Sequence, residues 1–305
     1  MVALGSELGR LAEVATARTQ AEVALVWDWQ NWWAVEGCAH PVNTFDYVDT
    51  VARHHRALWN GHVAVDVVTL DDDLSPYRVL VIPNQYMMSP AQTEAVRRFV
   101  AEGGHLLASF FSGIVNEDDE VVENGYPGAL REVIGVHVRE FSPLLDSVTV
   151  RAADGQTLLD GGFTATCTLW QDDMAVETAR PLAVYDEGYL AGQPAIVDHE
   201  LGQGHAVYLG TRLDDDALET LVKQVLDRAG VRSVHAAPRG VEVAERRTAT
   251  HRFLFLLNHR QDKAAVVLDR SGVDLITGRR LVPGEELVLD AADVAVVQSP
   301  LIPSP

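Results

Sequence analysis

The chain has 305 residues, enough for two domains and a substantial buried core. Its 47% hydrophobic and 22% charged residues are ordinary for a globular protein, whereas its formal net charge of −20 is extreme. Nucleic-acid phosphates and anionic lipids repel an acidic surface, and no basic stripe offsets this charge, so we expect neither nucleic acid nor a membrane as partner.

The first residues predict a short amphipathic helix. Apolar side chains recur at three- and four-residue spacing over residues 4–14, with charged residues on the other faces. The segment has no long apolar stretch, so we expect neither a signal peptide nor a membrane span there. The two cysteines, Cys38 and Cys167, lack metal-type spacing, which predicts free thiols in a reducing cytoplasm.

Four of the six tryptophans follow the first predicted strand. The short apolar run 23–26 is typical of a buried parallel strand, and residues 27–36 (WDWQNWWAVE) come directly after it as a predicted loop. Open α/β sheets meet ligands and partners at the carboxyl ends of their strands. We expect Trp27 and Trp29 to pack mainly as core, and Trp32 and Trp33 to face a partner or a sugar.

Strands and helices then alternate along the chain. The pattern predicts a helix over 45–58, strands over 62–70 and 77–82, a helix from Ser89-Pro90 to Gly103-Gly104, and a strand over 105–111. Such alternation indicates an α/β fold in which parallel strands carry right-handed crossovers and helices cover both faces of the sheet.

The second half of the chain has a different pattern. A short helix is predicted over 129–134 and a longer one over 214–229, and between them a β-rich insertion of hairpins spans about 146–210. Beyond residue 236 the helical signals vanish and six short segments predict a small antiparallel sandwich. We therefore predict two domains, over residues 1–235 and 236–305.

The sequence offers one weak candidate for covalent chemistry. No glycine-rich phosphate loop follows the first strand, because tryptophans occupy that place, so no nucleotide cofactor is expected. Residues 109–113 (SFFSG) stand where a nucleophile elbow would follow the fourth strand, with Ser109 or Ser112 as nucleophile. The flanking small residues of Gly-x-Ser-x-Gly are missing, so a turn role is the favoured interpretation.

Two acidic runs are candidates for a metal site. Residues 71–73 and 117–120 lack the alternating ligands and the turn glycine of a Ca²⁺ loop, so solvated loops are predicted and no metal is expected.

Several motifs along the chain resemble glycoside hydrolase family 42 β-galactosidases. They are VWDW (26–29), WWAVE (32–36), DLSPY (73–77), FSGIVNE (111–117), GYPGALR (125–131), GQPA (192–195), GQG (202–204) and DLITG (274–278). The resemblance covers nearly the whole chain, from the middle domain of that family to its C-terminus.

The resemblance implies a three-part parent enzyme. It has a (β/α)₈ barrel with both catalytic glutamates, a trimerisation domain with the Rossmann-like fold of class I glutamine amidotransferases, and a small C-terminal β-domain. A barrel needs roughly 250 residues, and all residues here are assigned to the other two parts. The resemblance therefore implies no catalytic residue in this chain, and a wall for a neighbour's active site built from Trp29, Trp32, Trp33 and Glu36.

Three functional hypotheses follow. The first is a non-catalytic assembly module, self-associating as a homotrimer, of a β-galactosidase whose barrel is separate or missing. The second is a galactoside-binding module that acts in trans with a barrel chain. The third is a small α/β hydrolase using Ser109 or Ser112.

Overall fold

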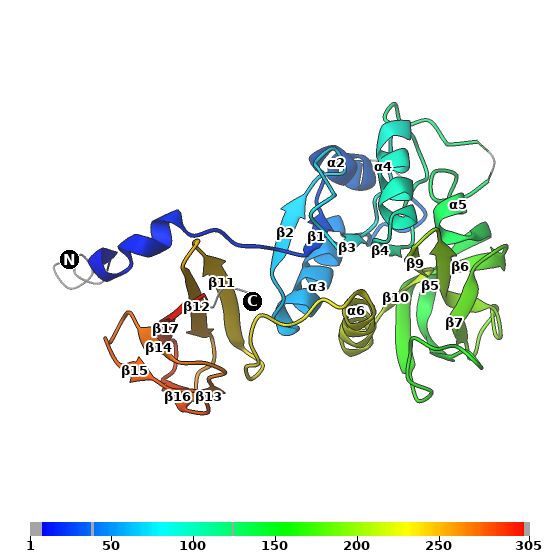
Figure 1. The fold of residues 1–305 in the computed structure, drawn as a ribbon. Helices are drawn as coiled ribbons and strands as arrows, with labels where there is room; N and C mark the ends of the chain where they lie inside the picture. Colours follow the sequence, from blue (N-terminus) through cyan, green and yellow to red (C-terminus); the bar gives the residue numbers. More distant parts are fainter. Residues whose placement is uncertain (1–7, 38–39, 124, 302–305) are drawn as a thin grey trace. The chain divides into compact units, whose positions relative to one another are not determined.

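The computed structural model describes residues 8–37, 40–123 and 125–301. The chain forms two compact units (Figure 1). The larger unit consists of residues 22–57 and 65–231, and the smaller one of the residues up to 21, residues 58–64 and those from 232 on. The fold is α/β, with one large mixed sheet in the larger unit and antiparallel sheets in the smaller.

A ten-stranded sheet is the centre of the larger unit, in the order β10-β6-β5-β7-β8-β9-β4-β3-β1-β2. Its parallel half consists of β2 (Val65–Val68), β1 (Val23–Val26), β3 (Val79–Ile82), β4 (His105–Ser109) and β9 (Gly204–Leu209). Every side chain of β1 and β3 is buried, as expected of short apolar strands covered on both faces. The predicted parallel strands are confirmed.

The helices described in the larger unit are α2 (Trp29–Gly37), α3 (Tyr47–Asn60), α4 (Pro90–Ala101), α5 (Arg131–Ile134) and α6 (Asp215–Ala229), although the last three residues of α3 belong to the smaller unit. Ser89 and Gln92 form a capping box at the start of α4, and Asp214 caps α6. Helices α4 and α6 lie on opposite faces of the parallel strands (Figure 1).

The antiparallel half of the sheet is larger than predicted. It contains β5 (Val136–Ala152), β6 (Thr164–Val176), β7 (Arg180–Tyr185), β8 (Pro194–Leu201) and β10 (Thr211–Leu213). Strand β5 begins ten residues before the predicted insertion at 146. Its pairing with β6 shifts register twice, after Val138 and after Leu144. Each shift reverses which side chains face inward, so the alternation on which a strand prediction depends is lost.

The smaller unit is an antiparallel β structure, as predicted. Its five-stranded sheet has the order β11-β12-β17-β14-β15, and β13 pairs with β16 in a second sheet. The strands are β11 (Val241–Arg247), β12 (His251–Asn258), β13 (Ala264–Val267), β14 (Gly272–Asp274), β15 (Arg280–Leu281), β16 (Glu286–Leu289) and β17 (Val294–Pro300). Their inward side chains, among them Leu256, Val266 and Leu287, form a separate core.

The N-terminal segment belongs to the smaller unit. Its described part starts with helical residues 8–10 and continues in the 3₁₀ helix η1 (Ala12–Thr16), so the last residues of the helix predicted over 4–14 are 3₁₀ rather than α-helical. Residues 4–7 of that prediction lie outside the described residues. Among the described residues, none of the helices has both the length and the apolar character needed to cross a bilayer.

Candidate functional site

The tryptophan stretch is a helix rather than the predicted loop. Two residues separate β1 from helix α2, which starts at the carboxyl edge of the parallel strands. The Oδ1 atom of Asp28 accepts hydrogen bonds from the backbone N–H groups of Gln30 at 2.8 Å and Asn31 at 3.3 Å. This is N-cap chemistry, and with neither glycine nor proline before Gly37 the helix continues for nine residues.

Two tryptophans of α2 face away from the protein. The side chains of Trp29 and Trp33 are 56% and 64% exposed, and residues four apart on a helix share one face. The prediction that Trp29 packs as core is therefore wrong, because α2 is helical and buries the face that carries Asn31 and Val35, opposite to the face of Trp29. Trp27 and Trp32 are half-buried, and the ring centroids of Trp29 and Trp32 lie 5.3 Å apart.

The fourth predicted wall residue, Glu36, is exposed at the end of α2. Its Oε1 accepts a hydrogen bond from the backbone N–H of Tyr47 at 3.3 Å, where α3 begins. The hydroxyl of Tyr47 in turn accepts from the backbone N–H of Asp28 at 3.2 Å, and burial raises the pKa of this phenol to about 12. Glu36 thus joins the end of α2 to the start of α3.

Buried amides attach α2 to the loop after β3, a feature that the sequence did not reveal. Asn31 is fully buried: its Nδ2 donates to the carbonyl of Asn84 at 3.0 Å and its Oδ1 accepts from the N–H of Met87 at 3.0 Å. Nε2 of Gln85 donates to Oδ2 of Asp28 at 3.2 Å. The polar residues between the tryptophans therefore fix the helix in place.

Neither serine of the elbow sequence is available as a nucleophile. Ser109 is 1% exposed and Ser112 is 0% exposed. Ser109 Oγ accepts from the backbone N–H of Asn84 at 2.8 Å, and Ser112 Oγ accepts from that of Gln85 at 3.0 Å and donates to the carbonyl of Ser109 at 2.7 Å. A serine nucleophile needs a base beside it and access to substrate, so the geometry does not support the hydrolase hypothesis.

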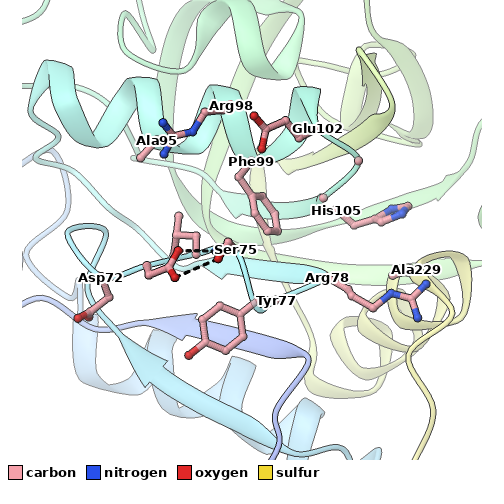
Figure 2. Close-up of a pocket in the computed structure, with 14 residues that line it drawn as sticks. Asp72, Ser75, Tyr77, Arg78, Ala95, Arg98, Phe99, Glu102, His105 and Ala229 are labelled. Carbon is pink, nitrogen blue, oxygen red and sulfur yellow. Dashed lines mark hydrogen bonds between the residues drawn. The ribbon is translucent and has the colours of Figure 1, made fainter.

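A hollow of about 560 Å³ lies at the opposite, amino-terminal edge of the sheet (Figure 2). Arg98 and Phe99 of α4 and its C-cap residue Glu102 face the loop before β3 across this hollow. The carboxylate of Asp73 accepts from the N–H and the hydroxyl of Ser75, both at 3.0 Å, which holds the pKa of Asp73 below its usual range. A general acid needs the opposite shift, so Asp73 closes a turn rather than serving acid–base chemistry.

The most perturbed carboxyl group is sealed inside the sheet. Asp172 of β6 is fully buried, and this burial raises its pKa to about 7. Its two oxygens accept from Trp170 Nε1 and from the hydroxyl of Tyr208, each at 2.8 Å. Asp172 has no access to a substrate, so its role is structural.

The described residues hold no group of three or more His, Cys, Asp or Glu side chains placed to bind a metal. Cys167 is a free, buried thiol, whose pKa is raised to about 12 by burial. Cys38 lies outside the described residues.

Comparison with known protein families gives two matches. The model described as the β-galactosidase trimerisation domain matches residues 21–232. The model described as the β-galactosidase C-terminal domain matches residues 240–299. Together they account for most of the chain.

Individual relatives agree with these matches. The chain is 37% identical to a β-galactosidase of Geobacillus sp. (strain Y412MC61) over 97% of its own length and 43% of that protein. It is 35% identical to one from Heyndrickxia coagulans, of which it covers 44%. The crystal structure of the Bacillus circulans sp. alkalophilus β-galactosidase superimposes with a TM-score of 0.92 at 34% identity, over 97% of this chain and 44% of that one. The chain thus spans less than half the length of these relatives.

Proposed function

The chain belongs to the glycoside hydrolase family 42 β-galactosidases, and we propose that its residues form the non-catalytic assembly portion of such an enzyme. The observation that carries the proposal is the pair of matches to a trimerisation domain and a C-terminal domain. Hydrolysis of terminal β-D-galactosides would need a barrel supplied by residues other than these.

The carboxylates of the described residues support this proposal. A retaining glycosidase acts through two carboxyl groups about 5 Å apart, one of them with a raised pKa. Asp172 has the raised pKa but is sealed in the core, and Asp73 borders a hollow but has a lowered pKa. The test is incubation of the purified chain with a chromogenic β-galactoside: we expect no turnover, and clear turnover would refute the proposal.

The partner in the proposal is a second and a third copy of the chain, closed into a homotrimer by one repeated heterologous contact. The description of the matched family as a trimerisation domain supports it. With a formal charge of −20 on each copy, association should weaken at low salt if acidic surfaces meet.

Within that trimer, Trp29, Trp32, Trp33 and Glu36 would wall a neighbour's substrate bowl. The outward indoles of Trp29 and Trp33 support this role, because exposed tryptophans are enriched where proteins bind partners or sugars. Trp32 and Glu36 would contribute mainly by supporting them, through ring contact with Trp29 and through the bond to Tyr47.

The exposed indoles also favour a second candidate function, a galactoside-binding module that acts in trans with a barrel chain. Stacking of a sugar on Trp33 would change its fluorescence, so titration with galactose and lactose should shift the tryptophan emission. A flat titration would remove this candidate and leave the assembly role.

The order of the parallel strands supports a more specific assignment of the fold of the larger domain. We assign the larger domain to the Rossmann-like scaffold of class I glutamine amidotransferases. Two observations support it: the parallel strands follow the order 2-1-3-4-5 of doubly wound sheets, with β9 as the fifth, and the backbone of Phe111, after β4, has φ +58°. Positive φ at the middle of SFFSG is the backbone conformation that the strained turn of a nucleophile elbow would have.

The proposed domain boundaries and a cytoplasmic location follow from the same matches and from one buried cysteine. We keep the boundary between 1–235 and 236–305, which family matches that end at 232 and resume at 240 support. The β-rich insertion predicted at about 146–210 starts earlier, with β5 at Val136. Residues 8–21 and 58–64 would then be segments of the first sequence domain that pack as part of the smaller unit. A cytoplasmic location is supported by the free thiol of Cys167.

A further inference from the structure

The turn after β4 holds an aromatic residue in a conformation that such residues avoid. Phe111 has φ +58°, in the left-handed region where its Cβ crowds the following carbonyl. Backbone strain of this kind persists only where the surroundings enforce it, and it marks places where position matters. Because Phe111 carries no nucleophile and its ring is buried, the turn must serve some purpose other than chemistry.

Residues 109–113, the elbow turn, are hydrogen-bonded throughout to the turn that follows β3, residues 84–87. The hydroxyls of Ser109 and Ser112 accept from the N–H groups of Asn84 and Gln85. In the reverse direction, the N–H of Gly113 donates to the carbonyl of Gln85 at 2.7 Å. The Nδ2 of Asn84 also donates to the carbonyl of Phe110 at 2.6 Å. The two turns therefore behave as one rigid piece.

The 84–87 turn in turn holds the start of α2. Asn31 bonds to the carbonyl of Asn84 and to the N–H of Met87, and Gln85 bonds to Asp28, the residue that caps the helix. Asn31 and Gln85 are fully buried, so water does not compete for these bonds.

The ring of Phe111 packs against the segment that follows α2. Its centroid lies 5.1 Å from that of His40 and 5.4 Å from that of Phe45, and it stacks on Tyr86 at 4.9 Å. His40 Nε2 lies 3.0 Å from the carbonyl of Ala34 in α2, which links this segment to the helix. The elbow turn thus reaches α2 at its start through the 84–87 turn and near its end through Phe111.

We propose that the elbow turn is a positioning device for the tryptophan surface, formed by Trp29 and Trp33. Ser109, Phe111 and Ser112 are positioning residues that hold α2 at the angle at which both indoles stand clear of the sheet. The inference rests on the proposed function only for the role of the tryptophan surface as a wall of a neighbour's substrate bowl. It explains why the turn keeps a strained backbone and two buried serines without a reactive group.

Hydrogen exchange of the full chain, read by mass spectrometry, tests the proposal. Ser112→Ala removes the acceptor for Gln85 N–H, and Ser109→Ala removes the acceptor for Asn84 N–H. Under conditions where each variant stays folded, we expect amides of residues 29–37 to exchange at least tenfold faster, with those of α6 unchanged. Val225→Ala, which opens a cavity at a buried position of α6, is the matched control and should leave the exchange of α2 unchanged.

The outcomes separate the inference from the proposed function. If α2 exchanges at the rate of the unsubstituted chain in both serine variants, or accelerates only together with α6, the serines are merely structural and the inference is overturned. Selective acceleration of α2 supports it. Light scattering on the same samples then addresses the other question: selective acceleration with an unchanged molar mass supports positioning while counting against a role of the tryptophan surface in assembly.

Discussion

The side-chain amide of Asn31 donates to the backbone carbonyl of Asn84 at 3.0 Å, joining the tryptophan helix to the end of β3 across 53 residues of sequence. The same side chain accepts from Met87 N–H, so one residue satisfies two backbone groups of a turn that carries no regular structure. The bond makes the exposed indoles part of the rigid sheet edge.

Loss of the Asn31 side chain should lower the stability of the fold. Asn31→Ala leaves a buried carbonyl and a buried N–H without partners, which we expect to lower the free energy of unfolding by about 2–4 kcal/mol. Urea denaturation followed by circular dichroism measures it. Gln30→Ala, the neighbouring exposed position, is the control and should change stability by less than about 0.5 kcal/mol. Equal effects at the two positions would contradict the structural role given to Asn31.

Removal of the exposed indoles should weaken association more than folding. In the double variant Trp29→Ala/Trp33→Ala, the dissociation constant measured by sedimentation should rise at least tenfold, because interface energy concentrates in a few aromatic anchors. The free energy of unfolding of the monomer should change less, since more than half of each side chain is already exposed to water. Tyr189→Ala, another exposed aromatic, is the comparison. An unchanged dissociation constant would exclude these tryptophans from the contact.

The buried carboxyl of Asp172 should make stability depend on pH. Its folded pKa of about 7 lies above the ordinary value, so the native state binds the proton more tightly than the unfolded chain does. Stability from this group is fully present below about pH 4 and is lost as pH rises through 7, by on the order of 3 kcal/mol between pH 5 and 8. Relative to the unsubstituted chain, Asp172→Asn should therefore gain stability over this interval. Parallel pH profiles would show that the group does not titrate there.

Gly204, in the hairpin that joins β8 and β9, is closely packed, so we expect its change to alanine to lower stability far more than the same change at the open position Gly162. A Cβ at Gly204 would lie 2.2 Å from the carbonyl oxygens of Val100 and Gly104, so Gly204→Ala must displace backbone. We expect a loss of more than about 2 kcal/mol, within the range of overpacking in a core. Gly162, with no atom within 4 Å of its Cβ position, should accept alanine at little cost. Thermal unfolding of the two variants compares them directly.

The two buried serines should not react with an activity probe. A fluorophosphonate requires an accessible, activated hydroxyl, whereas Ser109 and Ser112 are buried and already bonded. Mass spectrometry after incubation should find neither residue modified. Labelling of either one, abolished by its change to alanine, would restore the hydrolase hypothesis.

The sequence predicted the parallel strands and their helices because those signals are local. Ser89-Pro90 starts α4 with a capping box, and continuous apolar runs mark β1 and β3. The early start of β5 was missed because its register shifts break the alternation. The short β15 was missed because two residues carry no pattern.

The candidate site was only partly predictable. Indole enrichment after β1 indicates where exposed tryptophans lie, but which rings face outward depends on α2 being helical. A predicted loop gives Asp28 no role as a helix cap. The bonds from Asn31 to Asn84 and Met87 join segments distant in sequence, so no local pattern announces them. Likewise, the sequence indicates a turn at residues 109–113, but only the backbone shows that Phe111 has a positive φ.

The central claim, that these residues form an assembly module, is tested most directly by the molar mass of the purified chain in solution. Multi-angle light scattering at physiological salt should give three times the 33.3 kDa of one chain. A mass of 33.3 kDa at every salt and protein concentration would contradict the account.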